Sequence, residues 1–274
     1  MMIVEEIREN LKEFCERINK LGETEKPIVG IPKGATGSAA GLPFERWFQS
    51  EISKGIRQEV FGRLDFVNYF IKNHLDTASP ENLWWWTIQQ ITPETIRRVK
   101  KGEEPKLQQA MGDIIIKYGE DLNDVVLINV KATEVSNGEP IGRAPNIVSA
   151  FRLLNFFVEM FDEKPRLVDK VNVWLVGFDY NPIGKDKVRI RQCHFKDLFR
   201  LDLDEAPELN FDAAIQIQWH LGDMIEDEKQ ALEEFAVKLA EKYRTEWKDF
   251  TKRRDKKLEE IINKLFSAIK KSHV

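Results

Sequence analysis

The run DVVLINVK, residues 124–131, most constrains the fold, because it predicts a buried strand in a chain whose first hundred residues mainly have helical spacing. Four consecutive apolar residues and Val130 make up most of the run, and β-branched side chains dominate, which favours a strand enclosed on both faces. The preceding run DIIIKYG, residues 113–119, has the same character. The short polar turn between the two runs predicts a β-hairpin.

Helical spacing of apolar residues recurs on both sides of this hairpin. Residues 3–21 and 44–56 each carry an apolar stripe, and the Gly- and Pro-rich segment 22–43 between them predicts a loop. Further helices are predicted over residues 144–161 and 226–271.

Two later runs, residues 170–180 and 187–195, predict additional strands. The resulting order of elements predicts an α/β (α+β) fold class, with a mixed sheet flanked by helices and a helical C-terminal annex. We expect a core over residues 1–225 and the annex over residues 226–274 of the same domain.

Composition excludes several classes of protein. The 274 residues carry a net charge of −4, which argues against a non-specific nucleic-acid coat but leaves room for a DNA enzyme with a basic cleft. No apolar run approaches the roughly 18–20 residues of a membrane span, and the acidic amphipathic start does not resemble a signal peptide. The two cysteines have no C-x-x-C spacing, so we expect a reducing, cytoplasmic location without a zinc site or a membrane partner.

A charge and an amide occur where the buried run ends. Asp113 opens the first predicted strand, Lys131 closes the second, and Asn129 lies two residues earlier on the same strand face. An aspartate followed by an acid-x-Lys triplet is the arrangement that metal-dependent nucleases use. The acids and the carbonyl of Val130 would hold Mg²⁺, and the lysine would stabilise charge on the phosphate. The spacing alone fits ordinary solvated strand ends as well.

Four motifs in fixed order make the nuclease interpretation more specific. They are TGSAAGLPFERWF (36–48), LINVKATE (127–134), RAPNIVSAFRLL (143–154) and DAAIQIQWHLGD (212–223). Together they resemble the type II restriction endonucleases of the HincII/HindII family, which have the PD-(D/E)xK nuclease fold. The resemblance spans roughly residues 30–225 and implies Mg²⁺-dependent cleavage of double-stranded DNA by a homodimer at a short palindromic site.

The resemblance also assigns site residues. Asp113 matches the first metal-binding aspartate, Lys131 the catalytic lysine, and Asn129 falls on the second metal-binding aspartate. Asn129 is therefore a departure, because a neutral amide binds Mg²⁺ less well than a carboxylate. Two explanations are open: an introduced change that inactivates the enzyme, or a natural asparagine with another acid completing the site. The candidates for that acid are Glu45, Glu134 and Asp124.

Residues for DNA recognition follow from the same resemblance. Asn146 matches a base-reading asparagine, with Ala144 beside it, and Asn210 matches another base-contacting position. Arg143 replaces a glutamine that wedges into DNA, and an arginine could fill a narrow minor groove or reach a guanine. Both residues also have a purely structural interpretation, because Asn146 would suit the N-cap of a helix and Arg143 an exposed surface position.

The leading hypothesis is a site-specific, Mg²⁺-dependent endonuclease of a restriction system. Two alternatives remain open at the sequence level: a structure-specific repair or recombination nuclease of the same fold, and a sequence-specific DNA-binding protein without catalysis.

Overall fold

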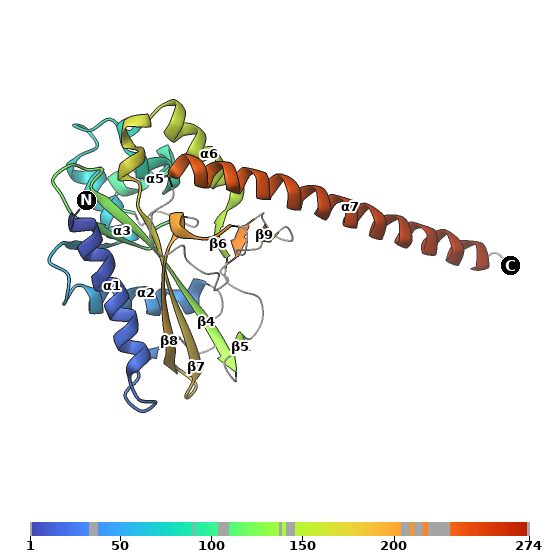
Figure 1. Cartoon of the computed structure of the whole chain (residues 1–274), viewed down its shortest axis with the longest axis horizontal. Helices are drawn as coiled ribbons and strands as arrows, with labels where there is room; N and C mark the ends of the chain where they lie inside the picture. Colours follow the sequence, from blue (N-terminus) through green and yellow to red (C-terminus); the bar gives the residue numbers. More distant parts are fainter. Residues whose placement is uncertain are drawn as a thin grey trace.

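The structure is a computed structural model that describes residues 2–32, 38–89, 91–103, 110–136, 139–140, 146–203, 209–210, 216–218 and 231–272. Its centre is a seven-stranded mixed sheet in the order β1-β8-β7-β4-β3-β2, with β5 paired to β4. Strands β4, β5, β7 and β8 of this sheet are labelled in Figure 1. A second sheet has three strands in the order β6-β10-β9. The predicted fold class, a mixed sheet flanked by helices, is confirmed.

The bounds of the elements are as follows. The strands are β1 Ile28–Gly30, β2 Glu59–Gly62, β3 Ile114–Lys117, β4 Val125–Ser136, β5 Glu139–Pro140, β6 Asn146–Ser149, β7 Val173–Pro182, β8 Lys187–Asp197, β9 Leu209–Asn210 and β10 Gln216–Gln218. The helices are α1 Met2–Lys20, α2 Ser38–Ile52, α3 Arg63–Asn73, α4 Trp84–Ile88, α5 Pro93–Lys100, α6 Ala150–Asp162 and α7 Leu232–Ser272. Three 3₁₀ turns are η1 Pro80–Asn82, η2 Pro165–Lys170 and η3 Leu198–Arg200.

Strand β4 divides the core into two layers by simple alternation. Val125 and Leu127 enter the cluster that contains side chains of α3 to α7, whereas Val126, Ile128 and Val130 enter the cluster that contains α1 and α2. Both faces of the strand are covered, which explains why its sequence is apolar without a break. The predicted hairpin is present, since β3 and β4 pair antiparallel from Ile114 opposite Ile128.

The helices bury the apolar stripes that the sequence predicts. On α1, Ile7, Leu11 and Phe14 pack toward the sheet, and on α2 Phe44 and Phe48 do the same. The consecutive tryptophans 84 and 85 are fully buried on the opposite face of the sheet. Each donates its indole N–H to a carbonyl in the β3–β4 turn, at 3.0 and 2.7 Å, so two large polar-tipped rings are accommodated without an unpaired donor.

Several sequence predictions of element bounds are wrong. The segment 144–161 is not one helix: Asn146–Ser149 is strand β6, and the helix begins at Ala150. The reason is non-local, because β6 pairs with β10, about 70 residues further along the chain. Likewise, the predicted loop 22–43 contains β1, which pairs with β8.

The sequence predicted that Lys131 closes its strand, and this prediction is wrong. Strand β4 continues to Ser136 because its parallel pairing with β7 runs on through Glu134. Strand backbone therefore both precedes and follows Lys131, so its position is better fixed than that of a residue at a strand end.

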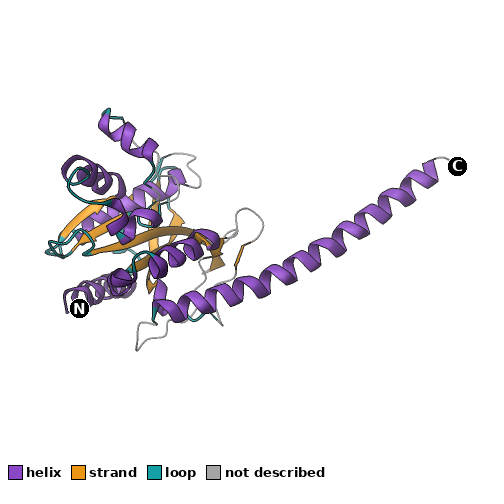
Figure 2. Ribbon diagram, turned by 90° about the horizontal axis from the view of Figure 1, so that it is seen from above, coloured by secondary structure: helices purple, strands orange, loops and turns teal. Residues whose placement is uncertain are grey.

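Helix α7 has 41 residues and leaves the body of the molecule after its first turns, as two perpendicular views show (Figures 1 and 2). Within the described part of the chain, no helix is both long enough and apolar enough to cross a membrane.

Candidate active site

A notch interrupts the central sheet on one side of β4, where pairing with β3 stops at Ile114 and β4 continues with β7 as its neighbour on the other side. The backbone N–H of Asp113 still donates to the carbonyl of Ile128 at 2.8 Å, but the pairing ends there. Among the described residues, β4 has no strand partner on this side from Asn129 to Glu134. We call the residues Asp113, Asn129 and Lys131 the notch, because they line this gap.

The carboxylate of Asp113 occupies the first unpaired position of the ladder. Its Oδ2 accepts a hydrogen bond of 2.8 Å from the N–H of Val130, so a side chain replaces a strand carbonyl. Register continued from Ile114 opposite Ile128 puts Asp113 beside Asn129, and Lys131 follows on the same strand face. The structure thus brings the three notch residues together.

Arg63 is a fourth member of the site that the sequence analysis missed. Its backbone N–H donates to the carbonyl of Asp113 at 2.9 Å, and its Nη1 lies 3.3 Å from Asp113 Oδ1. Arg63 begins α3 and stands fifty residues before its partner. No local pattern in the sequence could have paired them.

Asp113 is buried, with 7% of its surface exposed. Burial raises the pKa of its carboxyl above the usual value, although the charges of Lys131 and Arg63 and the Val130 hydrogen bond act in the opposite direction. A buried carboxylate with two cations and one backbone donor is held in a fixed orientation.

Glu45 on α2 carries the second carboxylate near the notch. Burial, reinforced by the negative charge of Asp113, raises the pKa of Glu45 to about 7. Arg63, Lys131 and Arg46 oppose this rise. The charges of Asp113 and Lys131 both act on Glu45, so the two acids and the lysine lie in one electrostatic environment. Perturbed pKa values of this kind are typical of functional sites.

Asn129 is almost fully buried and only half satisfied. Its Nδ2 donates to the carbonyl of Met111 at 2.8 Å, while its Oδ1 is a buried acceptor without a hydrogen-bond partner. An unsatisfied buried acceptor is unusual in a folded protein and calls for a cation or a donor. Carboxylate and amide oxygens, which Asp113, Glu45 and Asn129 provide here, are the chemistry that a hard cation such as Mg²⁺ prefers. A neutral amide contributes no charge, and the described residues contain no cluster of three His, Cys, Asp or Glu side chains that could hold a metal.

The other two candidates for the missing acid are poorly placed. Asp124 lies at the far end of β4 and pairs with Lys170 at 2.9 Å. Glu134 pairs in register with Tyr180, and strand alternation puts it on the opposite face from Asn129 and Lys131. The suggestion that Asp124 or Glu134 completes the site finds no geometric support.

A polar row crosses the sheet next to the notch. Lys131 lies in register with Gly177 of β7, and Gly177 with His194 of β8. His194 Nε2 is 2.8 Å from Asp179 Oδ2. Cross-strand partners share a face, so this partly exposed pair extends the polar surface beside Lys131. The alternation of polar residues in β8 was the signal for it in the sequence.

The predicted DNA-reading residues are only partly described. Arg143 and Ala144 lie outside the described residues. Asn146 belongs to β6 and Asn210 to β9, and both strands pair with β10, where Gln218 is opposite Asn146 and Gln216 opposite Asn210. The expectation that Asn146 begins a helix is therefore wrong, whereas the two asparagines do belong to one small sheet.

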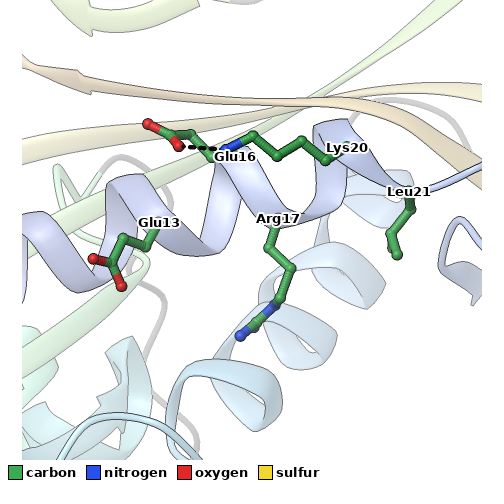
Figure 3. A pocket seen from close by; sticks show the side chains of 5 residues that line it. All are labelled: Glu13, Glu16, Arg17, Lys20 and Leu21. Atoms are coloured by element: carbon green, nitrogen blue, oxygen red, sulfur yellow. Dashed lines mark hydrogen bonds and ion pairs between the residues drawn. The ribbon is translucent and has the colours of Figure 1, made fainter.

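A shallow hollow on α1 is unrelated to these residues. It is lined by Glu13, Glu16, Arg17, Lys20 and Leu21 (Figure 3). Its acids and bases are exposed, and the 3.0 Å pair between Glu16 and Lys20 is a local contact within the helix. Such a surface provides no enclosed site.

Comparison with known proteins identifies the family. A model of the restriction endonuclease HincII matches residues 95–272, which include the whole notch. The chain belongs to the HincII restriction endonuclease family. It is 25% identical over 237 residues to the type II restriction enzyme HincII of Haemophilus influenzae, covering 82% of this chain and 87% of that one. The type II restriction enzyme HindII of H. influenzae strain Rd is 24% identical over the same shares. Among solved structures, the NlaIV restriction endonuclease aligns with a TM-score of 0.35 and 14% identity over 89% of both chains.

Membership of the HincII family confirms the resemblance that the four motifs carried. The family is one of nucleases, so the notch belongs to a restriction endonuclease-like protein. Glu45 lies outside residues 95–272, although the two Haemophilus relatives align with most of the chain.

Proposed function

We propose that this protein is a type II restriction endonuclease that cuts double-stranded DNA at a short palindromic site, with the notch as its active site. The observation that supports this most directly is the Asp113 carboxylate, fixed by Val130 and Arg63 beside Lys131 in a chain of the HincII family. Asp113, Asn129 and Lys131 are the proposed catalytic positions.

Mg²⁺ is the proposed cofactor. Asp113, the Oδ1 of Asn129 and the carbonyl of Val130 would hold it, with Glu45 as the accessory acid. When bound, the ion would offset charge on the phosphate and lower the pKa of its water. Asp113 can serve without rearrangement, because its orientation is already set by a backbone N–H and an arginine.

The chain's own residues account for the remaining steps. Lys131 presents a partly exposed ammonium at the notch, where it can donate to a phosphate oxygen as negative charge develops. Arg63 adds a second cation on the other side of Asp113. The buried apolar residues of β3 and β4 exclude water from the protein side of the site.

DNA recognition is proposed for Arg143, Ala144, Asn146 and Asn210. Both asparagines belong to strands of the small sheet, and amide side chains can hydrogen-bond to base edges. We also propose a homodimer, because a two-fold protein addresses both strands of a palindrome with one site per subunit. Residues 1–225 would form the endonuclease core and residues 226–274 its annex, in a cytoplasmic protein.

Asn129 favours one second candidate, a sequence-specific DNA-binding protein with little cleavage. Loss of one anionic ligand weakens Mg²⁺ binding, whereas DNA affinity rests mainly on contacts made elsewhere. Whether the natural residue at position 129 is aspartate or asparagine distinguishes the nuclease from the DNA-binding protein.

Plasmid cleavage in Mg²⁺ tests the proposal. The Asn129 protein should cut very slowly, Asn129→Asp should give discrete fragments at least 100-fold faster, and Asn129→Asp with Lys131→Ala should lose that gain. Cutting only at flaps or junctions would instead indicate a repair nuclease. Tight site-specific binding without cutting in every form would indicate the binding protein. Rapid cutting by the Asn129 form would indicate that Glu45, and not residue 129, provides the second metal-binding acid.

A further inference from the structure

A fully buried glutamine pairs with the backbone directly before Asp113. Gln89 follows α4 and exposes none of its surface. Its Oε1 accepts a hydrogen bond of 2.9 Å from the N–H of Gly112, and its Nε2 donates to the carbonyl of the same glycine at 3.2 Å. One primary amide therefore satisfies both polar backbone groups of Gly112, as a neighbouring strand would.

Other hydrogen bonds fix the backbone on either side of this glycine. The carbonyl of Met111 accepts from Asn129 Nδ2 at 2.8 Å. Asp113 donates its N–H to the carbonyl of Ile128 at 2.8 Å, and its own carbonyl accepts from the N–H of Arg63 at 2.9 Å. Strand β4, helix α3 and the residue after α4 therefore all set the path of the chain into Asp113.

Gly112 has no room for a side chain. A Cβ built on it would lie 3.0 Å from the Cβ of Leu127 and 3.2 Å from the amide nitrogen of Gln89. A glycine in an extended segment often marks a site where another group approaches the backbone closely. The fit of the glycine against β4 and the glutamine therefore leaves the backbone little freedom one residue before Asp113.

The backbone path at Gly112 affects where the Asp113 carboxylate lies. Its Oδ2 accepts from the N–H of Val130 at 2.8 Å, and its Oδ1 lies 3.3 Å from Arg63 Nη1. An aspartate side chain is short, so a shift of its Cα moves the carboxylate by a similar distance. Misplacement of a reacting group by about 1 Å can lower a rate about 10²-fold.

We propose that Gln89 is a positioning residue of the active site, which holds Gly112 so that the Asp113 carboxylate stays at the notch. The inference rests on the proposed nuclease function, in which Asp113 is a catalytic position. Gln89 acts through the backbone of Gly112. A neutral amide suits this role, because it provides a donor and an acceptor without placing a further charge near a buried carboxylate.

Three variants of the full chain test the role of Gln89. Gln89→Met removes the amide and keeps the length of the side chain. Gly112→Ala displaces the same backbone and leaves the glutamine in place, so the test does not depend on the stability of one variant. Asn19→Leu is the matched control, because Asn19 makes the same pair of hydrogen bonds to Cys193 of β8, donating to its carbonyl at 2.9 Å and accepting from its N–H at 2.8 Å. Strand β8 is separated from β4 by β7.

Hydrogen exchange followed by NMR in EDTA reports the position of Asp113 without any cleavage. In Gln89→Met and in Gly112→Ala, the Val130 amide should exchange about tenfold faster or more, relative to the amides that join β7 and β8. The reason is that its acceptor is the Asp113 carboxylate. In Asn19→Leu the Cys193 amide should lose protection, and the Val130 amide should keep it.

Single-turnover cleavage of plasmid in Mg²⁺ measures the effect on the reaction, in the Asn129→Asp form for which the proposed function gives measurable rates. In that form the aspartate cannot donate to the Met111 carbonyl, so the pairing with Gln89 matters more. Adding Gln89→Met should lower the rate about 10- to 100-fold, while the affinity for the same plasmid in EDTA stays within about twofold. Adding Asn19→Leu should change neither the rate nor the affinity.

Three outcomes would overturn the role of Gln89. They are a Val130 amide that stays protected in Gln89→Met, a cleavage rate that Gln89→Met leaves unchanged, and an equal loss of rate in Asn19→Leu. Absence of cleavage in every form, together with the expected change at Val130, would reject the nuclease function and support the control of Asp113 by Gln89.

Discussion

At the residue scale, the site is governed by the burial of carboxylates beside a small number of cations. Asp113 and Glu45 both have raised pKa values, which means that the folded protein holds them charged only at a cost. Arg63 and Lys131 reduce that cost without removing it. The metal-free site therefore favours any ligand that brings positive charge, and its stability should depend on pH in a defined direction.

Arg63 can be tested by Arg63→Leu, with Arg63→Lys as the charge-preserving control. At pH 8 the loss of the cation leaves Asp113 buried with one counter-charge fewer, and we expect the unfolding free energy to fall by about 1–3 kcal/mol. At pH 5 the fall should be smaller, because the raised pKa of Asp113 leaves more of its carboxyl neutral. Urea unfolding in EDTA at the two pH values measures this, and an equal loss at both would contradict the assigned role.

A second prediction concerns Glu45. The change of folding stability with pH that it causes has the opposite sign to that of an ordinary ion-paired acid. Its folded pKa of about 7 lies above the unfolded value near 4.5, so the folded state binds more protons in that window. Stability in EDTA should fall as pH rises from about 4.5 to about 7. Glu45→Gln should remove a loss on the order of 2 kcal/mol between pH 5 and pH 8.

The control for Glu45 is Glu51→Gln, a partly exposed acid on the same helix that pairs with Lys54. We expect it to leave the difference between pH 5 and pH 8 unchanged. If Glu45→Gln and Glu51→Gln gave the same pH dependence, Glu45 would not be the group that titrates in this window.

At the element scale, local periodicity predicted the elements whose pairing is local and missed those whose pairing is distant. The hairpin of β3 and β4 was predictable because both strands and their turn lie within residues 113–136. Strand β6 was not, because its partner β10 lies about 70 residues away. The extra length of β4 likewise depends on β7, with which it pairs in parallel.

The same division applies to the candidate site. Asp113, Asn129 and Lys131 could be found because the hairpin brings them together within nineteen consecutive residues, 113–131. Arg63 could not, since the packing of α3 against the sheet brings it to the site from fifty residues away. Sequence reasoning therefore finds the residues that a local hairpin brings together and misses a group that helix packing brings beside them.

Helix α7 gives an element-scale prediction about its buried start. Phe235 is fully buried between Phe157 and Phe199, with centroids 6.1 and 5.3 Å away. Phe235→Ala should reduce the unfolding free energy by about 3–5 kcal/mol, because it removes a buried ring and leaves a cavity. Its neighbour Val237 is more than half exposed, so Val237→Ala should change stability by less than about 0.5 kcal/mol.

Thermal and urea unfolding of the two variants measure this difference. A small effect of Phe235→Ala on the core, together with loss of helicity, would show that α7 detaches without affecting the rest of the fold. That result would favour a separate annex over a helix that belongs to the core.

At the scale of the whole molecule, an acidic chain has to bind an acidic polymer. A net charge of −4 provides no general attraction to DNA, so on the proposed function affinity comes from local groups and, in the proposed homodimer, from two subunits at once. The notch supplies Lys131, Arg63 lies beside it, and the proposed reading residues would contribute base contacts. Binding by two linked subunits would then supply what charge does not.

The last prediction follows from that linkage and uses the duplex that the protein selects from a random library. In a dimer, binding of the second half-site is intramolecular, which raises affinity for the palindrome by about 10²- to 10⁴-fold over one half-site. The native chain should therefore bind the palindrome much more tightly than a duplex with a single half-site, and a duplex in which the two half-sites are moved apart by half a helical turn should lose most of the gain, because one two-fold dimer can no longer reach both. Fluorescence anisotropy with the Asn129 form, in EDTA and at fixed salt, measures the three affinities. Equal affinity for the palindrome and the single half-site would contradict the proposed homodimer.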